Sequence, residues 1–212
     1  MHWHNPGPVR HPPGFIEPCL PTLGRALPTG PQWAFEIKHD GFRFICWRDG
    51  ERVRVYSRRG TDYTDRVPAI AEALIALRVR SVTIDGEGVV CRHNGVTDFD
   101  ILRAAMGRKG SREAFLYAFD LLELDGQDLR PEPWATRRAT LTSLMRKVNP
   151  GIRLSEHLYA GDGEAVYQHA CRMGLEGIVA KRRDSRYRSG RSPDWIKVKN
   201  PDAPAATRVI ER

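Results

Sequence analysis

The amino-acid sequence predicts an α+β fold whose sheets are largely antiparallel. Predicted strands outnumber predicted helices, and short turns join several neighbouring strands, of which Asp49-Gly50 is the strongest hairpin signal. The chain has no G-x-x-x-x-G-K-[ST] loop and no G-x-G-x-x-G after a strand, the usual marks of a phosphate site at a helix N-terminus. Any bound nucleotide must therefore be held by side chains.

The first half of the chain favours strands, because apolar and polar side chains alternate over short stretches. The last of these stretches is interrupted by Gly86 and Gly88. The expected strands cover residues 34–38, 42–48, 52–57 and 81–91. Apolar side chains at helical spacing indicate helices over residues 65–77 and 98–106, the second of which ends before Gly107.

The second half of the chain alternates strands with helices. The clearest amphipathic helix is expected over residues 134–148. Another helix, over residues 162–173, ends at Gly174, where a left-handed C-cap favours glycine. A turn is expected at Asp125-Gly126. The expected strands cover residues 114–122, 152–156, 177–181 and 195–199.

Composition and charge limit the class of protein. The chain has 212 residues, 41% hydrophobic and 28% charged, which is typical of a soluble globular domain. No apolar run of about 18 residues exists, and the N-terminus lacks a signal-peptide core, so we expect a cytoplasmic, nucleoid-associated protein without a membrane partner. The four cysteines lie far apart, which argues against structural zinc and disulfides. The net charge of +8 fits either a polyanionic partner or a merely basic surface.

The distribution of proline divides the chain. Eight of the fifteen prolines fall within residues 1–32, where few apolar residues recur periodically. We expect residues 1–16 to form a flexible N-terminal arm, residues 17–200 to form one folded domain, and residues 201–212 to form a C-terminal tail.

Six short sets of residues combine side chains that can carry chemistry. Taken singly, each is also typical of a surface strand, a turn or a core aromatic residue. The first set places a lysine at a strand end, followed by Asp-Gly and arginine, in Glu36-Ile37-Lys38-His39-Asp40-Gly41-Phe42-Arg43. The other five sets, in chain order, are Ser57-Arg58-Arg59-Gly60, Asp85-Gly86-Glu87-Gly88, Phe119-Asp120-Leu121-Leu122, Glu176-Gly177-Ile178-Val179-Ala180-Lys181 and Trp195-Ile196-Lys197-Val198-Lys199.

In kind and in order, these sets resemble the motifs of the covalent nucleotidyltransferases, the superfamily of ATP-dependent DNA ligases, RNA ligases and capping enzymes. The pattern Lys38-x-Asp40-Gly41-x-Arg43 is similar to the signature that carries the nucleotidylated lysine. The later sets, with residues 187–199, look most like the bacterial end-joining ligases. The resemblance runs from about Phe15 to Asn200. It implies an ATP-grasp-like nucleotidyltransferase domain with largely antiparallel sheets flanked by helices.

The resemblance implies that Lys38 attacks the α-phosphate of ATP, expels pyrophosphate and holds AMP through a phosphoramidate. A free lysine is protonated at neutral pH, so the nucleophile must lose a proton before it acts. If Lys181, Lys197 and Lys199 gather round the same phosphate, they disfavour a further cation at Lys38 and neutralise charge in the transition state. Asp40 would position the nucleophile.

The same resemblance implies the contacts to ATP. Glu36 would read the adenine amino group and so favour ATP over GTP, while Phe119 would stack on the base. Glu87 and Glu176 would flank Mg²⁺ or Mn²⁺, or the ribose. The other expected ATP-binding residues are Ile37, Lys38, Arg43, Arg58, Lys197 and Lys199.

A run of cations lies between the last two motifs. Residues 181–191 hold six cations with Tyr187 among them, a composition that suits a loop gripping the backbone of nicked or broken double-stranded DNA. A solvated basic loop is the alternative. The expected DNA-binding residues are Arg58, which would meet the incoming 5′-phosphate, and Arg182, Arg183, Arg186, Arg188 and Arg191.

The sequence departs from the resemblance after the last motif. Ligases of this kind usually continue into an oligonucleotide-binding (OB) barrel, but only thirteen residues follow Lys199. A fragment, a separate OB-fold protein or other end-joining factor, and a minimal stand-alone enzyme all remain open. Two other activities compete with a DNA ligase. An RNA ligase or GTP-using capping enzyme is disfavoured by Glu36 and the later motifs, and a non-catalytic DNA-end-binding relic by the presence of every catalytic residue type.

Overall fold

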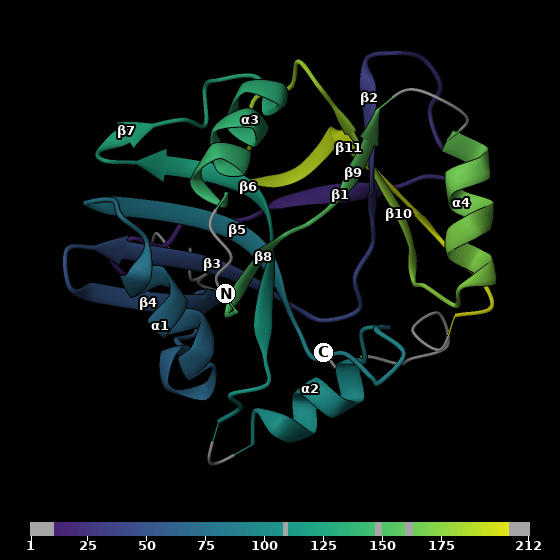
Figure 1. Cartoon of the computed structure of the whole chain (residues 1–212). Helices are drawn as coiled ribbons and strands as arrows, with labels where there is room; N and C mark the ends of the chain where they lie inside the picture. Colours follow the sequence, from purple (N-terminus) through teal and green to yellow (C-terminus); the bar gives the residue numbers. More distant parts are fainter. Residues whose placement is uncertain (1–10, 108–109, 147–149, 160–162, 204–212) are drawn as a thin grey trace, which may run out of the picture.

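The computed structural model describes residues 11–107, 110–146, 150–159 and 163–203, and two sheets form its body (Figure 1). Sheet A has the order β1-β11-β10-β2-β9, and sheet B has the order β4-β3-β5-β6-β7, with β8 beside β6. The strands of sheet A are β1 (Cys19–Leu23), β2 (Trp33–Ile37), β9 (His157–Tyr159), β10 (Gly177–Arg182) and β11 (Gly190–Lys199). The strands of sheet B are β3 (Phe42–Asp49), β4 (Arg52–Ser57), β5 (Ser81–Val89), β6 (Phe115–Leu124), β7 (Gln127–Asp128) and β8 (Ile152–Leu154).

The strand pairing is mostly antiparallel, as the sequence predicts. Among the named strands, only β1 beside β11 and β8 beside β6 run parallel to their neighbours. Both expected tight turns form hairpins. Gly50, at φ +60°, links β3 to β4, and Asp125 and Gly126, both at positive φ, link β6 to β7.

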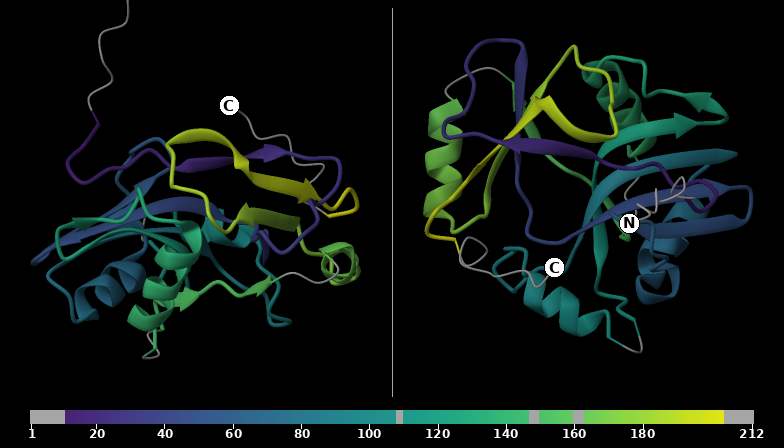
Figure 2. Two further views of the ribbon diagram at one scale, coloured as in Figure 1. Left: turned by 90° about the horizontal axis from the view of Figure 1, so that it is seen from above. Right: turned by 180° about the vertical axis from the view of Figure 1, so that it is seen from behind.

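Helices lie on the outer faces of both sheets and, in one case, beyond the strand ends (Figure 1). They are a 3₁₀ turn η1 (Thr64–Arg66) and the helices α1 (Pro68–Ala76), α2 (Phe99–Ala105), α3 (Trp134–Leu144) and α4 (Gly163–Arg172). Figure 2 (left) shows α1 and α3 on the side of the molecule opposite to β1 and β11. Helix α4 packs against β10 and β2 of sheet A. Among the described residues, no helix has the length and apolar character needed to cross a membrane.

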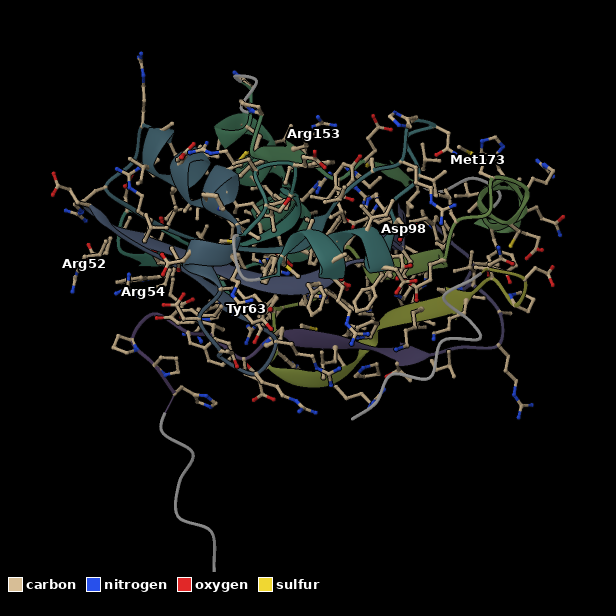
Figure 3. The ribbon with its side chains drawn as sticks, turned by 90° about the horizontal axis from the view of Figure 1, so that it is seen from below. Arg52, Arg54, Tyr63, Asp98, Arg153 and Met173 are labelled. Atoms are coloured by element: carbon tan, nitrogen blue, oxygen red, sulfur yellow. The ribbon has the colours of Figure 1, made fainter. Side chains whose placement is uncertain are left out.

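Two expected helices begin later than the sequence pattern indicates. Proline takes the first helical position of α1 at Pro68, because its ring presets a helical φ and its missing N–H has no partner there. The preceding residues form η1 instead. Asp98, which is labelled in Figure 3, caps α2. Its side chain accepts from the backbone N–H of Asp100 and of Ile101. Residues 147–148 and 162, expected at the ends of α3 and α4, lie outside the described residues.

Three apolar clusters hold the layers together. One lies between sheet B and helices α1, α2 and α3, and includes Phe44, Leu74 and Leu116. Another lies between sheet A and α4. The third joins the two sheets, with Ala34 and Trp195 from sheet A against Ile45 and Phe119 from sheet B. This inter-sheet cluster supports the cavity described below.

Some segments differ from the sequence expectation. Strands β1 and β9 are not predicted, and β11 begins at Gly190 rather than at residue 195. Of the arm expected over residues 1–16, residues 1–10 lie outside the described part. Residues 11–16 pack on β4, where the Tyr56 hydroxyl donates to the Pro13 carbonyl at 2.8 Å and Phe15 meets the Tyr56 ring edge-on.

Candidate nucleotide-binding site

A cavity of about 190 Å³ lies between the two sheets. Strands β2, β10 and β11 form one wall, and residues of β3, β5 and β6 form the other. Its charged and aromatic lining residues include most of the predicted ATP-binding set. The charged and aromatic residues of the lining are Glu36, Lys38, His39, Arg43, Arg58, Glu87, Phe119, Lys181, Arg191, Trp195 and Lys197. Ile37 is among the apolar residues of the lining.

Lys38 follows the last residue of β2 and faces Glu176, which precedes β10. The backbone N–H of Lys38 donates to the Gly177 carbonyl at 2.9 Å, which extends the β2–β10 pairing by one residue. Its Nζ lies 2.6 Å from Glu176 Oε2, with side-chain exposures of 22% and 9%. The two residues that the sequence places at strand ends therefore form an ion pair that solvent and a ligand can still reach.

Further cations surround this ion pair. Lys197 on β11 lines the cavity, and its pKa is lowered first by burial and then by the positive charges of Lys38, Lys199 and Arg191. Lys199 is exposed and lies outside the cavity lining. This group of cations favours an anionic ligand beside Lys38.

The inner end of the cavity holds a second ion pair. Lys181 is 2% exposed, and its Nζ lies 2.7 Å from Glu36 Oε2. The same Nζ is 4.1 Å from the ring centres of both Phe119 and Trp195. Burial lowers the pKa of Lys181, although the charges of Glu36 and Asp120 oppose this effect. The structure thus pairs Lys181 with Glu36, in the cavity that Lys38 and Lys197 also line.

The two carboxylates of the third motif have different surroundings. Asp85 is fully buried and accepts two hydrogen bonds from Arg43, at 2.5 and 2.7 Å. Glu87 lines the cavity, and burial raises its pKa to about 7 against the lowering charges of Arg43 and Lys38. Glu176 raises this pKa further by repulsion. Of this motif, only Glu87 is available to a ligand.

The described residues contain no group of three or more His, Cys, Asp and Glu side chains placed to hold a metal ion. The donor set still suits Mg²⁺ or Mn²⁺. Glu87 and Glu176 both interact with Lys38 and repel each other. Mg²⁺ is commonly bound by one or two carboxylates that are completed by water and substrate phosphate.

Other predicted residues lie away from the cavity. Asp40 and Glu176 line a neighbouring cavity of about 240 Å³ near the start of α2. Arg58 and Arg191 line the main cavity. The other four predicted DNA-binding arginines do not line this cavity. These four are Arg182, Arg183, Arg186 and Arg188. Arg182 pairs with Asp184, and Arg183 donates to the Pro31 carbonyl at 3.0 Å.

Three further residues belong to the site, although the sequence predicts no role for them. Trp195 closes the inner end, and Tyr187 donates to Asp85 at 2.5 Å. His39 stacks on Tyr117 at 4.0 Å, and its pKa falls to about 4 through burial and the charge of Lys38, so the ring is neutral. His39 and Trp195 belong to the first and sixth motif sets, and Tyr187 is the one tyrosine in the basic run, but the sequence assigns a role to none of the three.

Two largely antiparallel sheets that enclose a strand-end lysine, carboxylates and further cations define the domain as a nucleotidyltransferase type. The chain belongs to the ATP-dependent DNA ligase domain family, whose family model matches residues 22–199.

Similar proteins come from bacteria and archaea. The chain is 40% identical over 190 residues to the multifunctional non-homologous end joining protein LigD of Pseudomonas aeruginosa, covering 88% of this chain and 22% of that protein. It is 36% identical over 187 residues to LigD of Mycobacterium tuberculosis, covering 87% and 24%. A DNA ligase of Thermococcus fumicolans is 35% identical over 205 residues, covering 91% and 36%. The chain thus spans about a quarter of the length of the LigD relatives.

Solved structures show the same fold. A mycobacterial DNA ligase D complexed with ATP and MES matches with a TM-score of 0.74 and 37% identity, over 87% of this chain and 60% of that one. Chlorella virus DNA ligase-adenylate matches with a TM-score of 0.62 at 17% identity, over 87% and 68%, which shows the fold alone.

Proposed function

We propose that this chain is the adenylation unit of an ATP-dependent DNA ligase. In the first step Lys38 Nζ attacks the α-phosphate of ATP. The new N–P bond replaces the bond to the β-phosphate bridging oxygen, and pyrophosphate leaves. In the second step the AMP passes from Lys38 to the 5′-phosphate of nicked or broken DNA, which prepares the strand for joining. Such a substrate implies work at the nucleoid, in the cytoplasm.

One observation carries the proposal, namely the surroundings of Lys38. A reactive amine at a strand end contacts one carboxylate at 2.6 Å and interacts with a second, while Lys197 and Lys199 add positive charge. The amine must lose a proton before attack, and Glu176 lies close enough to accept it. The cations would neutralise charge that develops on the phosphate. Asp40, next to the neighbouring cavity, would position the nucleophile.

The inner end of the cavity suits the base. Phe119 would stack on adenine, and Glu36 would accept from its amino group. In support, Glu36 Oε1 is buried and accepts no hydrogen bond from any described residue, and its ion-pair partner Arg138 lies 3.8 Å away, so this oxygen can still accept from a ligand donor. Ile37 would contact the nucleotide beside Lys38, and Arg43 would contact the ribose or phosphate. Lys181 would stay paired with Glu36, in the cavity that also receives the α-phosphate.

Glu87 and Glu176 would hold Mg²⁺ or Mn²⁺, which supplies charge neutralisation at the phosphates of ATP. Arg58 and Arg191, at the cavity, would meet the DNA 5′-phosphate. The remaining basic residues would contact the DNA backbone, and they are Arg182, Arg183, Arg186 and Arg188. We propose residues 17–200 as the unit that does this work, with an OB-fold protein or other end-joining factor supplying further DNA contacts.

The test is uptake of label from α-labelled ATP with Mg²⁺, after pyrophosphate has removed any AMP already bound. Wild-type protein should hold the label through denaturing electrophoresis, and Lys38→Ala should not. Lys38→Arg is the matched control, because it keeps a cation opposite Glu176 but lacks the primary amine, and it should also remain unlabelled. Label from GTP rather than ATP would indicate a capping-type enzyme. Unlabelled wild-type protein that still binds DNA would indicate a relic.

A further inference from the structure

The basic segment, residues 182–191, makes a contact that its charge does not explain. Tyr187 in its middle is 5% exposed, whereas the adjacent Arg186 and Arg188 are exposed. The Tyr187 hydroxyl donates to Asp85 Oδ2 at 2.5 Å and accepts from the Cys19 backbone N–H at 2.9 Å. One side chain of this segment therefore reaches β5 of sheet B and β1 of sheet A.

Asp85 is the acceptor that orients Arg43. Arg43 Nε donates to Asp85 Oδ1 at 2.5 Å, and Arg43 Nη2 donates to Oδ2 at 2.7 Å. The same Nη2 donates to the Cys19 carbonyl at 3.1 Å. Oδ2 is thus shared by Arg43 and Tyr187, and Cys19 bonds to both of them. Two-point hydrogen bonds to a carboxylate are strong and fix the plane of the guanidinium.

Arg43 is the member of this network that reaches the nucleotide pocket. It lines the cavity together with Lys38 and Glu87, and its guanidinium carbon lies 4.4 Å from the centre of the Phe119 ring. The direction of this guanidinium at the ATP site depends on where Asp85 is held. Asp85 is held in turn by Tyr187.

Tyr187 is itself firmly placed. Its backbone N–H donates to the Arg130 carbonyl at 2.9 Å, and the Arg137 guanidinium lies 5.7 Å from its ring centre. Burial, followed by the charge of Asp85, raises the pKa of Tyr187 well above its usual value. This shift favours the protonated phenol, which is the form that donates to Asp85.

We propose that Tyr187 is a positioning residue for the nucleotide pocket, which fixes Asp85 and through it the Arg43 guanidinium. The basic segment then serves the adenylation step as well as contact with DNA. The identity of the ligand rests on the proposed function, but the hydrogen-bond network does not. Without the hydroxyl, Asp85 keeps its two bonds to Arg43 and loses the third side-chain donor, so Arg43 gains freedom to turn.

The experiment compares Tyr187→Phe with Tyr56→Phe. Tyr56 is the matched control, because it is 4% exposed, belongs to the same inter-sheet cluster and also donates one hydrogen bond, but to the Pro13 carbonyl. The first readout is hydrogen exchange at the Arg43 Nε–H, followed by ¹⁵N NMR and assigned by its loss in Arg43→Lys. Tyr187→Phe removes the hydrogen bond from the tyrosine hydroxyl to the charged Asp85 carboxylate. Exchange of the Arg43 Nε–H should therefore become roughly tenfold faster in Tyr187→Phe and stay unchanged in Tyr56→Phe.

The second readout is label uptake from ATP without DNA, where the second-order rate constant of labelling should fall roughly tenfold in Tyr187→Phe alone. Equal exchange at Arg43 in the two variants would overturn the proposal, and so would equal label uptake in them. Wild-type protein that takes up no label would overturn the proposed function, and the Arg43 signal would still decide the role of Tyr187. Melting temperatures of both variants separate a general loss of stability from the release of Arg43.

Discussion

Replacing Arg137 by methionine should destabilise the domain severely. Arg137 and Asp120 are both fully buried, and two hydrogen bonds of 2.7 and 2.8 Å join them. Arg137 Nη1 also donates to the carbonyls of Glu132 and Ser185. In the variant the Asp120 carboxylate stays buried without its counter-charge, which costs about 3–5 kcal/mol of unfolding free energy. Urea unfolding with a slope of about 2 kcal/mol per molar would show the midpoint falling by about 2 M.

Arg130→Met is the matched control for this prediction. Arg130 also makes two hydrogen bonds to a carboxylate, Asp128, each at 2.8 Å, but the two side chains are 42% and 49% exposed. Such a pair contributes about 0–1 kcal/mol, so the midpoint should move by less than about 0.5 M. Pairing Arg137→Met with Asp120→Leu removes both charges and should recover much of the loss. Equal midpoint shifts for the two single variants would refute the reasoning, because Arg137 differs from Arg130 in its burial and in two further hydrogen bonds to carbonyls, and both differences predict the larger loss.

Two further predictions concern single carboxylates. Burial raises the pKa of Glu87 from 4.5 to about 7, so the folded state binds this proton more tightly than the unfolded state. The tighter binding of a proton by Glu87 in the folded state stabilises the fold fully below about pH 4.5, and this stabilisation is lost as the pH rises to about 7. In the absence of metal, the stability of Glu87→Gln should therefore rise relative to that of the wild type as the pH increases through this window. The measurement is the urea midpoint of both proteins from pH 4 to 8, and a difference between them that does not change with pH would contradict the prediction. Asp98→Ala removes the cap of α2, with its bonds of 2.8 and 3.0 Å, and should cost about 1 kcal/mol, or about 2–4 °C in Tm. Asp98→Asn keeps a capping oxygen, so an equal loss in both variants would count against the cap.

The elements that sequence predicts well are those with a local signal. Strands β3 and β4 are joined at Asp49-Gly50, and Gly50 supplies the positive φ that the turn needs. Strand β1 has no such signal, because Cys19–Leu23 contains a proline and its partner in the sheet is β11, which begins at Gly190. Strand β9 has only three residues and pairs with the distant β2. Both strands exist because of long-range pairing, which propensity does not reveal.

The same distinction applies to the site. Lys38, Glu87 and Phe119 stand out in sequence because each belongs to a recognisable motif, and all three line the cavity. The roles given to them remain proposals. The contact between Glu36 and Lys181 depends on β10 lying beside β2, where Glu36 is opposite Val179. The bond from Tyr187 to Asp85 crosses 102 positions of sequence. Neither contact follows from a motif read along the chain.

The Glu36–Lys181 pair bears on how the proposed base site could choose its nucleotide. Lys181 occupies one oxygen of Glu36, Oε2, at 2.7 Å, while Oε1 accepts no hydrogen bond from any described residue and lies 3.8 Å from the Arg138 guanidinium. An adenine amino group can donate to Oε1 while the ion pair stays intact. Guanine in the same orientation presents a carbonyl oxygen there, and two buried acceptors facing each other cost about 1–3 kcal/mol. Lys181, whose Nζ lies 4.1 Å from the ring centres of Phe119 and Trp195, holds Glu36 in place. This discrimination therefore does not require the carboxylate to be ordered by the nucleotide itself. The lysine expected from sequence to neutralise phosphate thus has a second use in this proposal, which is to fix the acceptor that distinguishes the bases.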